Sequence, residues 1–167
     1  MLVRTAKLSD INSVMKIESA GFLPEIQEEE SVFIKRIKLC PQLFLIFEQN
    51  GKTAGYLSAE YMNHIPETAE ELSLGHIPAT DVSKNYIYIS SFSILPEYRG
   101  NGNGKICWNM ALDYLGRDNK FILLVNEAWQ GAKHIYLQSG FKELKSFKDF
   151  FPAEANSFTA GTLMIRE

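Results

Sequence analysis

The residues best suited to chemistry lie in LPEYRGNGNGK, from Leu95 to Lys105, where three glycines alternate with other residues between an arginine and a lysine. Read as R-x-x-G-x-G, the stretch places Arg99, Gly102 and Gly104 at the start of an amphipathic helix. Backbone N–H groups at such a start point into one concavity, and the helix dipole adds positive potential there. Side chains at the two glycines would block a pyrophosphate. The stretch therefore predicts a pyrophosphate-binding loop.

Two other phosphate-binding motifs fit poorly. A Walker loop requires a glycine, four residues and then Gly-Lys-Ser/Thr, but here Arg99 stands at the first glycine and Ile106 follows Lys105. A dinucleotide fingerprint requires G-x-G-x-x-G directly after a strand. This chain has G-x-G-x-G, and the segment 95–99 separates it from the strand. A glycine-rich loop without a ligand is the remaining alternative.

The composition is that of a globular protein able to bury a core of its own. The chain has 167 residues, 46% hydrophobic and 22% charged, with a net charge of -3 at pH 7. These values do not suit a nucleic-acid binder, and neither an apolar leader nor a membrane-length apolar run is present. Cys40 and Cys107 match no metal spacing. We expect one domain over residues 1–167, cytoplasmic, with reduced thiols and no metal, nucleic-acid or membrane partner.

The hydrophobic periodicity predicts a single mixed α/β domain with the element order β-α-α-β-β-β-α-β-α-β-β. The dipeptide Asn50-Gly51 between two β-rich runs predicts a hairpin with a type I′ turn. The polar segment 63–84 is long for a connector, which indicates a functional loop.

Two helices are expected before the hairpin. Ser9 or Asp10 should cap the first and Gly21 should end it, and Pro41 should stop the second. The second helix carries basic residues after a run of acids, which we interpret as a solvated face with paired charges. These residues are Glu28, Glu29, Glu30, Lys35, Arg36 and Lys38.

These features together resemble the GNAT superfamily of acyl-CoA-dependent N-acetyltransferases. SFSILPEYRGNGNGK is similar to motif A of that family, and GAKHIYLQSGF is similar to motif B. Ala132, Tyr136, Gly140 and Phe141 match motif B, and the order of elements matches from about residue 2 to 165. The resemblance implies a mixed, mostly antiparallel sheet of about seven strands, flanked by helices and splayed at the central strand pair.

The resemblance also implies acetyl-CoA as cosubstrate and no metal. The backbone of Phe92, Ser93 and Ile94 would pair with the pantetheine arm like an added strand, and the N–H of Phe92 would polarise the thioester carbonyl. The pyrophosphate would be bound by Arg99, Gly100, Asn101, Gly102, Asn103, Gly104 and Lys105. Tyr136 matches the tyrosine that protonates the leaving thiolate in that family. Its alternative interpretation is a tyrosine packed on a helix face.

A narrower resemblance is to the arylalkylamine N-acetyltransferase branch, carried by FLPE at 22–25 and by EELSLGHIP at 70–78. That branch has a His-x-His pair on the strand entering motif A, where this chain has Tyr88 and Ser90. Neither is a good base at neutral pH, since tyrosine titrates near pH 10. A water held by Ser90 and Tyr88, the carboxylate of Glu60 and the imidazole of His76 are the remaining candidates for the base.

The function expected from these features is acetyl transfer from acetyl-CoA to the primary amine of a small molecule, by direct attack in a ternary complex. Phe22 and Tyr88 are expected in the acceptor pocket, with Glu60 and His76 at the acceptor end. Cys107 lies on an apolar helix face and is interpreted as a small core residue rather than a nucleophile. A peptide acceptor and a non-catalytic acyl-CoA sensor are the alternative functions. The sequence leaves a monomer and a homodimer open.

Overall fold

The computed structural model describes residues 1–77 and 83–167. In this part of the chain the strands form one seven-stranded sheet in the order β1-β2-β3-β4-β5-β7-β6. The strands are β1 (Leu2–Thr5), β2 (Phe44–Gln49), β3 (Lys52–Met62), β4 (Tyr86–Ile94), β5 (Phe121–Asn126), β6 (Lys142–Ala153) and β7 (Ser157–Arg166). The helices are α1 (Ile11–Gly21), α2 (Glu30–Leu39), α3 (Asn103–Leu115) and α4 (Gln130–Gln138). The predicted element order is therefore confirmed.

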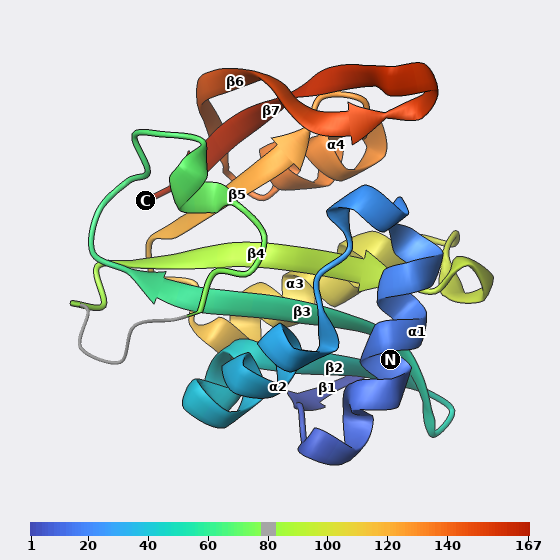
Figure 1. Ribbon diagram of the computed structural model, residues 1–167. Helices are drawn as coiled ribbons and strands as arrows, with labels where there is room; N and C mark the ends of the chain where they lie inside the picture. The colour runs from blue at the N-terminus through green and yellow to red at the C-terminus, as the bar shows by residue number, and fades with distance from the viewer. Residues whose placement is uncertain (78–82) are drawn as a thin grey trace.

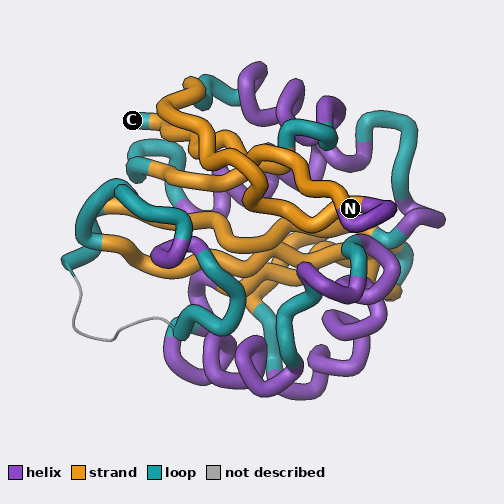
Figure 2. The backbone as a smooth tube through the Cα atoms, turned by 45° about the horizontal axis from the view of Figure 1, so that its top comes forward, coloured by secondary structure: helices purple, strands orange, loops and turns teal. Residues whose placement is uncertain are grey.

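The sheet lies as a layer between helices, with α1 and α2 over one face and α3 over the other (Figures 1 and 2). Strand β2 alternates between the two cores, since Phe44 and Ile46 pack under α1 and α2 while Leu45 and Phe47 pack under α3. Coverage on both faces explains the apolar run from Phe44 to Phe47. Among the described helices, none has the length and apolar character needed to cross a bilayer.

The central strand pair is joined over a short distance only. Strands β4 and β5 run parallel and pair at Ile87 with Phe121, Tyr88 with Ile122 and Ile89 with Leu123. Beyond that point β4 continues to Ile94 and β5 to Asn126 without further pairing between them. The other five strand pairings of the sheet are antiparallel. The predicted mostly antiparallel sheet, splayed at its centre, is confirmed.

The hairpin between β2 and β3 has the predicted turn. Asn50 and Gly51 have φ angles of 53° and 73°. Two consecutive positive φ angles define the type I′ turn, and asparagine and glycine adopt them at low cost.

Two local predictions were wrong in detail. Asp10 precedes α1, but its carboxylate does not cap that helix; it accepts hydrogen bonds from Arg4 and from the N–H of Lys7. The interpretation of a solvated charged face on α2 holds for the exposed Lys35 and Lys38 but fails for Arg36, which is 4% exposed and forms an ion pair with Glu28. Arg36 is buried because it shares a helix face with Phe33 and Ile37, which pack into the core.

Candidate active site

A cleft of about 1080 Å³ opens where β4 and β5 separate. It is bordered by α1, the start of α3, α4, β6 and the segment before residue 78. The predicted site residues in its lining are Phe22, Glu60, His76, Tyr88, Ser90, Phe92, Ser93, Ile94, Arg99, Gly104 and Tyr136. The remaining predicted residues of the glycine loop, Gly100, Asn101, Gly102, Asn103 and Lys105, lie at the adjoining start of α3, outside that lining.

The start of α3 offers unpaired N–H groups and free space. The first bond into the helix runs from the N–H of Ile106 to the carbonyl of Gly102 at 3.0 Å, so the N–H groups of Gly104 and Lys105 precede the helical ladder. Gly100 and Gly102 have φ angles of 88° and 76°, and a β-carbon at either would meet no described heavy atom within 4 Å. Such a helix start fits the phosphate groups of a coenzyme.

The polar side chains of this loop form hydrogen bonds with different parts of the protein. Arg99 lines the cleft, and its Nε donates to the carbonyl of Ile94 at 2.8 Å. Lys105 reaches across to α4, where its Nζ lies 2.9 Å from Oε1 of Gln138. Asn103 donates through Nδ2 to the carbonyl of Tyr98 at 2.9 Å. Of the two cations of this loop, Arg99 is thus the one that borders the cleft, and Asn103 braces the turn.

The edge of β4 that faces the cleft carries main-chain groups free of strand pairing. The N–H of Leu95 donates to the carbonyl of Ala54 on β3 at 2.9 Å. Because N–H directions alternate along a strand, those of Phe92 and Ile94 point to the opposite edge, into the splay. Ser90 is an extra residue in β4, since Ser91 pairs with Ser58 and Ile89 pairs with Ala59. The bulge at Ser90 thus marks where the open edge begins.

Tyr136 borders the cleft from α4 and belongs to the core on the α3 face. Its ring centroid lies 4.5 Å from that of Trp108, and the residue is 8% exposed. Burial raises the pKa of its phenol above the ordinary value, so Tyr136 remains protonated at neutral pH.

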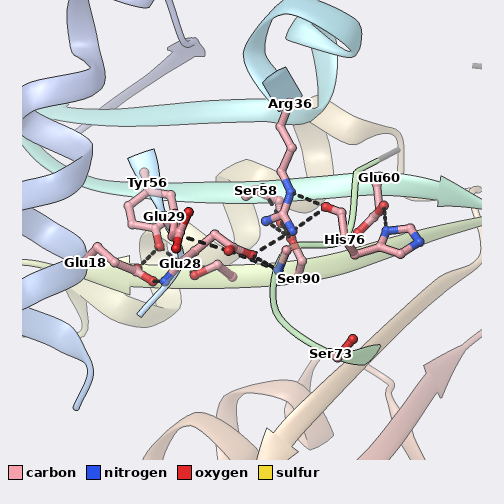
Figure 3. A network of polar contacts seen from close by, with 12 residues as sticks. Glu18, Glu28, Glu29, Arg36, Tyr56, Ser58, Glu60, Ser73, His76 and Ser90 are labelled. Atoms are coloured by element: carbon pink, nitrogen blue, oxygen red, sulfur yellow. Dashed lines mark hydrogen bonds and ion pairs between the residues drawn. The ribbon is translucent and has the colours of Figure 1, made fainter. Parts of the chain in front are cut away.

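Glu60 and His76 meet on the opposite face of the sheet. The imidazole Nδ1 of His76 lies 2.5 Å from Oε2 of Glu60, a carboxylate that is fully buried (Figure 3). This hydrogen bond raises the pKa of His76. An ionised carboxylate only accepts, so Nδ1 carries a proton and Nε2 is the acceptor nitrogen of the neutral ring. The structure thus joins two of the candidates for the base into one pair.

Tyr88 and Ser90 lie near that pair. Tyr88 is the cross-strand partner of Glu60, and burial, followed by the charge of Glu60, raises the pKa of its phenol. Ser90 Oγ donates to the carbonyl of Ser58 at 3.1 Å and accepts from Arg36 at 3.4 Å. Tyr88 is therefore a neutral hydrogen-bonding group rather than a base, and Ser90 is held by two neighbours.

Two buried charge networks beside the cleft were missed by the sequence analysis. In the first, Arg36 contacts Glu28 and the backbone of the His76 segment (Figure 3). In the second, the hydroxyl of Tyr56 donates to Glu18 and lies 2.6 Å from Ser91 Oγ. Burial raises the pKa of Glu18. Glu18 also accepts from the N–H of Glu28 at 2.8 Å, which connects the two networks.

Aromatic rings from three separate segments meet across the cleft. The ring of Trp129 lies 5.6 Å from that of Phe22 and 5.7 Å from that of Phe151, which in turn lies 4.8 Å from Phe150. All four residues line the cleft. Phe22 was predicted there, whereas Trp129, Phe150 and Phe151 were missed. Their signal in the sequence is the aromatic cluster FKDFF and a tryptophan directly before α4.

Comparison with known proteins gives one family match for the chain. Residues 11–141 match the family described as Acetyltransferase (GNAT) family, while a comparison with curated proteins gives no match.

Solved structures share the fold. The loading GNATL domain of CurA from Lyngbya majuscula is 15% identical, with a TM-score of 0.79 over 99% of this chain and 96% of that one. The ribosomal-protein-S18-alanine N-acetyltransferase from Escherichia coli is 16% identical, with a TM-score of 0.74 over 98% and 91%. Arabidopsis thaliana Naa50, in complex with the bisubstrate analogue CoA-Ac-MVNAL, is 14% identical, with a TM-score of 0.71 over 99% and 97%.

Proposed function

Because the chain belongs to the acetyltransferase (GNAT) family, we propose that it transfers an acetyl group from acetyl-CoA to the primary amine of a small molecule. The observation that carries the proposal is that three features border the same cleft. A protonated tyrosine borders it on one face of the sheet, a histidine–carboxylate pair borders it on the other, and the open edge of β4 lies between them. Acetyl-CoA, when bound, supplies the activated acetyl group.

The donor half is proposed to use main-chain groups and one arginine. Arg99 and the N–H groups of the loop 100–105 would hold the pyrophosphate, except that of Asn103, which donates to the carbonyl of Gly100 at 3.0 Å. The unpaired edge of β4 from Phe92 to Ile94 would bind the pantetheine arm, with the N–H of Phe92 as the donor to the thioester carbonyl. The bond from Arg99 to the carbonyl of Ile94 supports this arrangement, because it fixes the end of that edge against the loop.

The acceptor half is proposed to use His76 as general base. Glu60 holds Nδ1–H, which leaves Nε2 to accept a proton from the ammonium group of the acceptor. Ser90 would hold a water between the amine and the imidazole, and the neutral phenol of Tyr88 would contribute a hydrogen bond to that water. The buried Tyr136 would return a proton to the departing thiolate, since its raised pKa keeps it protonated.

The aromatic cluster favours an acceptor with an apolar or aromatic body. Phe22, Trp129 and Phe151 present ring surfaces to the cleft, and rings also attract ammonium groups. Such an acceptor would agree with the narrower resemblance to arylalkylamine N-acetyltransferases, which rests on the segments 22–25 and 70–78, the latter extending beyond the described residues.

The experiment that tests the proposal is release of CoA thiol from acetyl-CoA across an amine panel. The panel contains phenethylamine and tryptamine, aliphatic mono- and diamines, and short peptides with free N-termini; a reaction without amine is the control. Turnover with small amines, confirmed by mass spectrometry of the acetylated product, is the expected result. Turnover with peptides alone would make the acceptor a peptide, and CoA binding without turnover would make the protein a sensor.

A further inference from the structure

The buried pair of Arg36 and Glu28 is the feature that the proposed reaction does not yet use. The two side chains are 4% and 6% exposed, and Nη2 of Arg36 lies 3.1 Å from Oε2 of Glu28. A buried ion pair seldom stabilises a fold more than apolar side chains of the same size would. Its other contacts therefore indicate what the pair does.

Those contacts converge on two consecutive residues. Arg36 donates from Nε at 3.2 Å and from Nη2 at 2.8 Å to the carbonyl of His76. Glu28 accepts from the N–H of Gly75 at 3.1 Å and 3.0 Å through its two oxygens. The N–H of Gly75 is thus held by Glu28, just before α2, and the carbonyl of His76 is held by Arg36, within α2.

The arrangement continues to the cleft. Nη1 of Arg36 lies 3.4 Å from Ser90 Oγ at the bulge of β4, and the N–H of Glu28 donates to Glu18 on α1. Figure 3 shows Arg36 between the His76 backbone and Ser90, with the imidazole of His76 turned toward Glu60. The side chain of His76 is 39% exposed, so packing alone does not fix it. Its position depends on the backbone that carries it.

We propose that Arg36 and Glu28 are positioning residues for the base, clamping the His76 carbonyl and the Gly75 N–H so that the imidazole is held against Glu60 at the cleft. This inference rests on the proposed function of the same site. Arginine suits the task because its planar fork can donate to a carboxylate and a carbonyl at once, which a lysine ammonium does less well.

The charged groups around His76 make the clamp distinguishable from a simple charge effect. Glu60 faces the imidazole from β3, Arg36 from α2 and Glu28 from the residues before α2, while the neutral Tyr88 lies opposite Glu60 on β4. The bond to Glu60 has the largest effect and raises the pKa of His76; the charge of Arg36 lowers it and that of Glu28 raises it.

A clamp and a pure charge effect predict opposite changes in the pKa of His76 for Arg36→Gln. Through charge alone, Arg36→Gln would raise the pKa of His76 and Glu28→Gln would lower it. If the residues act as a clamp, both substitutions release His76 from Glu60. The pKa then falls toward its ordinary value of about 6.5 in both variants.

The experiment is an NMR titration of the imidazole C–H resonances in the full-length protein, which needs no turnover. His76 is assigned among the three histidines with His76→Gln. The expected result is a lower pKa in Arg36→Gln, in Glu28→Gln and in the double variant, with partial recovery in Arg36→Lys. The double variant removes both charges of the Arg36–Glu28 pair, so neither is left buried without the other, and thermal denaturation and CoA binding report the fold. Asp113→Asn/Arg117→Gln, which removes an exposed ion pair at the end of α3, is the matched control.

Opposite shifts in Arg36→Gln and Glu28→Gln, or no shift in the double variant, would overturn the clamp. Where the wild type acetylates an amine, kcat/KM should fall by about 10-fold or more in the double variant, and the midpoint of its pH profile should move down with the pKa of His76. A wild type without turnover would contradict the proposed function, and the titration would still decide the clamp.

Discussion

A β-carbon placed on Gly55 would lie 2.6 Å from the backbone oxygen of Ser93, so β3 and β4 approach each other more closely there than a side chain allows. Ser93 belongs to the edge of β4 proposed to bind pantetheine. Gly55→Ala must therefore displace the backbone of β4. We expect it to lower the free energy of unfolding by about 1–3 kcal/mol and to weaken CoA binding.

Urea denaturation and calorimetric titration with CoA measure the two effects. Gly131→Ala is the control for stability, because a β-carbon there would meet no described heavy atom within 4 Å and alanine favours helices. Equal stability of Gly55→Ala and the wild type would show that the close approach is not a constraint.

Gly102→Val should abolish CoA binding, since its side chain would occupy the space in front of the loop. The matched control is Gly51→Val in the hairpin, where φ is 73° against 76° at Gly102 and the surroundings are equally open. Both substitutions carry a similar backbone strain, of about 1–2 kcal/mol. Calorimetry should show normal CoA affinity for Gly51→Val only; normal affinity in both would refute the pyrophosphate loop.

Tyr136→Phe should lower kcat by about 10²–10⁴-fold and leave the dissociation constant of CoA unchanged, because only the proton donor is removed. Tyr114→Phe, at an exposed position of α3, serves as the control. Steady-state thiol release and calorimetry give the two quantities. An unchanged kcat would reassign Tyr136 to packing against Trp108.

The pair of His76 and Glu60 should stabilise the fold more at low pH. The pKa of His76 is raised in the folded protein, so its stabilising contribution is fully present below the ordinary pKa of about 6.5 and is lost as pH rises through the raised value. The difference in unfolding free energy between the wild type and His76→Gln should therefore shrink with increasing pH. Denaturation from about pH 5 to 9 tests this, with the exposed His134→Gln as control. A difference that grows with pH would contradict the pairing.

Cys107 should be unreactive in the folded protein. It is fully buried, and burial raises the pKa of its thiol to about 11, so about one molecule in 10,000 carries a thiolate at pH 7. Iodoacetamide should not label it before unfolding, and Cys107→Ala should retain turnover. An acetylated cysteine in intact-mass spectra during turnover would point instead to a covalent intermediate.

The sequence predicted the fold well because the relevant signals are local. The hairpin follows from two residues, Asn50 and Gly51, whose conformational preferences select one turn. The helices follow from apolar residues at helical spacing, and the apolar run 121–125 of β5 follows from the place of that strand inside the sheet. The splay of β4 from β5 came from the family resemblance.

The parts of the site that were missed depend on contacts between distant segments. Glu28 and Arg36 looked like surface charges, since charged residues are seldom buried and the pattern of charges does not show what lies opposite. One local signal was available: Arg36 follows Phe33 by three residues and precedes Ile37, which places it on the apolar face of α2. Trp129 and Phe151 are separated by α4 and most of β6 and meet only in the folded chain.

The bulge at Ser90 and the open edge beyond it divide the cleft into a donor half and an acceptor half that should tolerate substitutions differently. The proposed donor half would depend on Arg99 and on peptide groups of β4 and of the loop before α3, so most other substitutions that preserve the backbone and its glycines would leave it intact. The proposed acceptor half would depend on the identities of Phe22, His76 and Phe151. Under this proposal, substitutions at these positions would change acceptor preference while coenzyme binding stays constant.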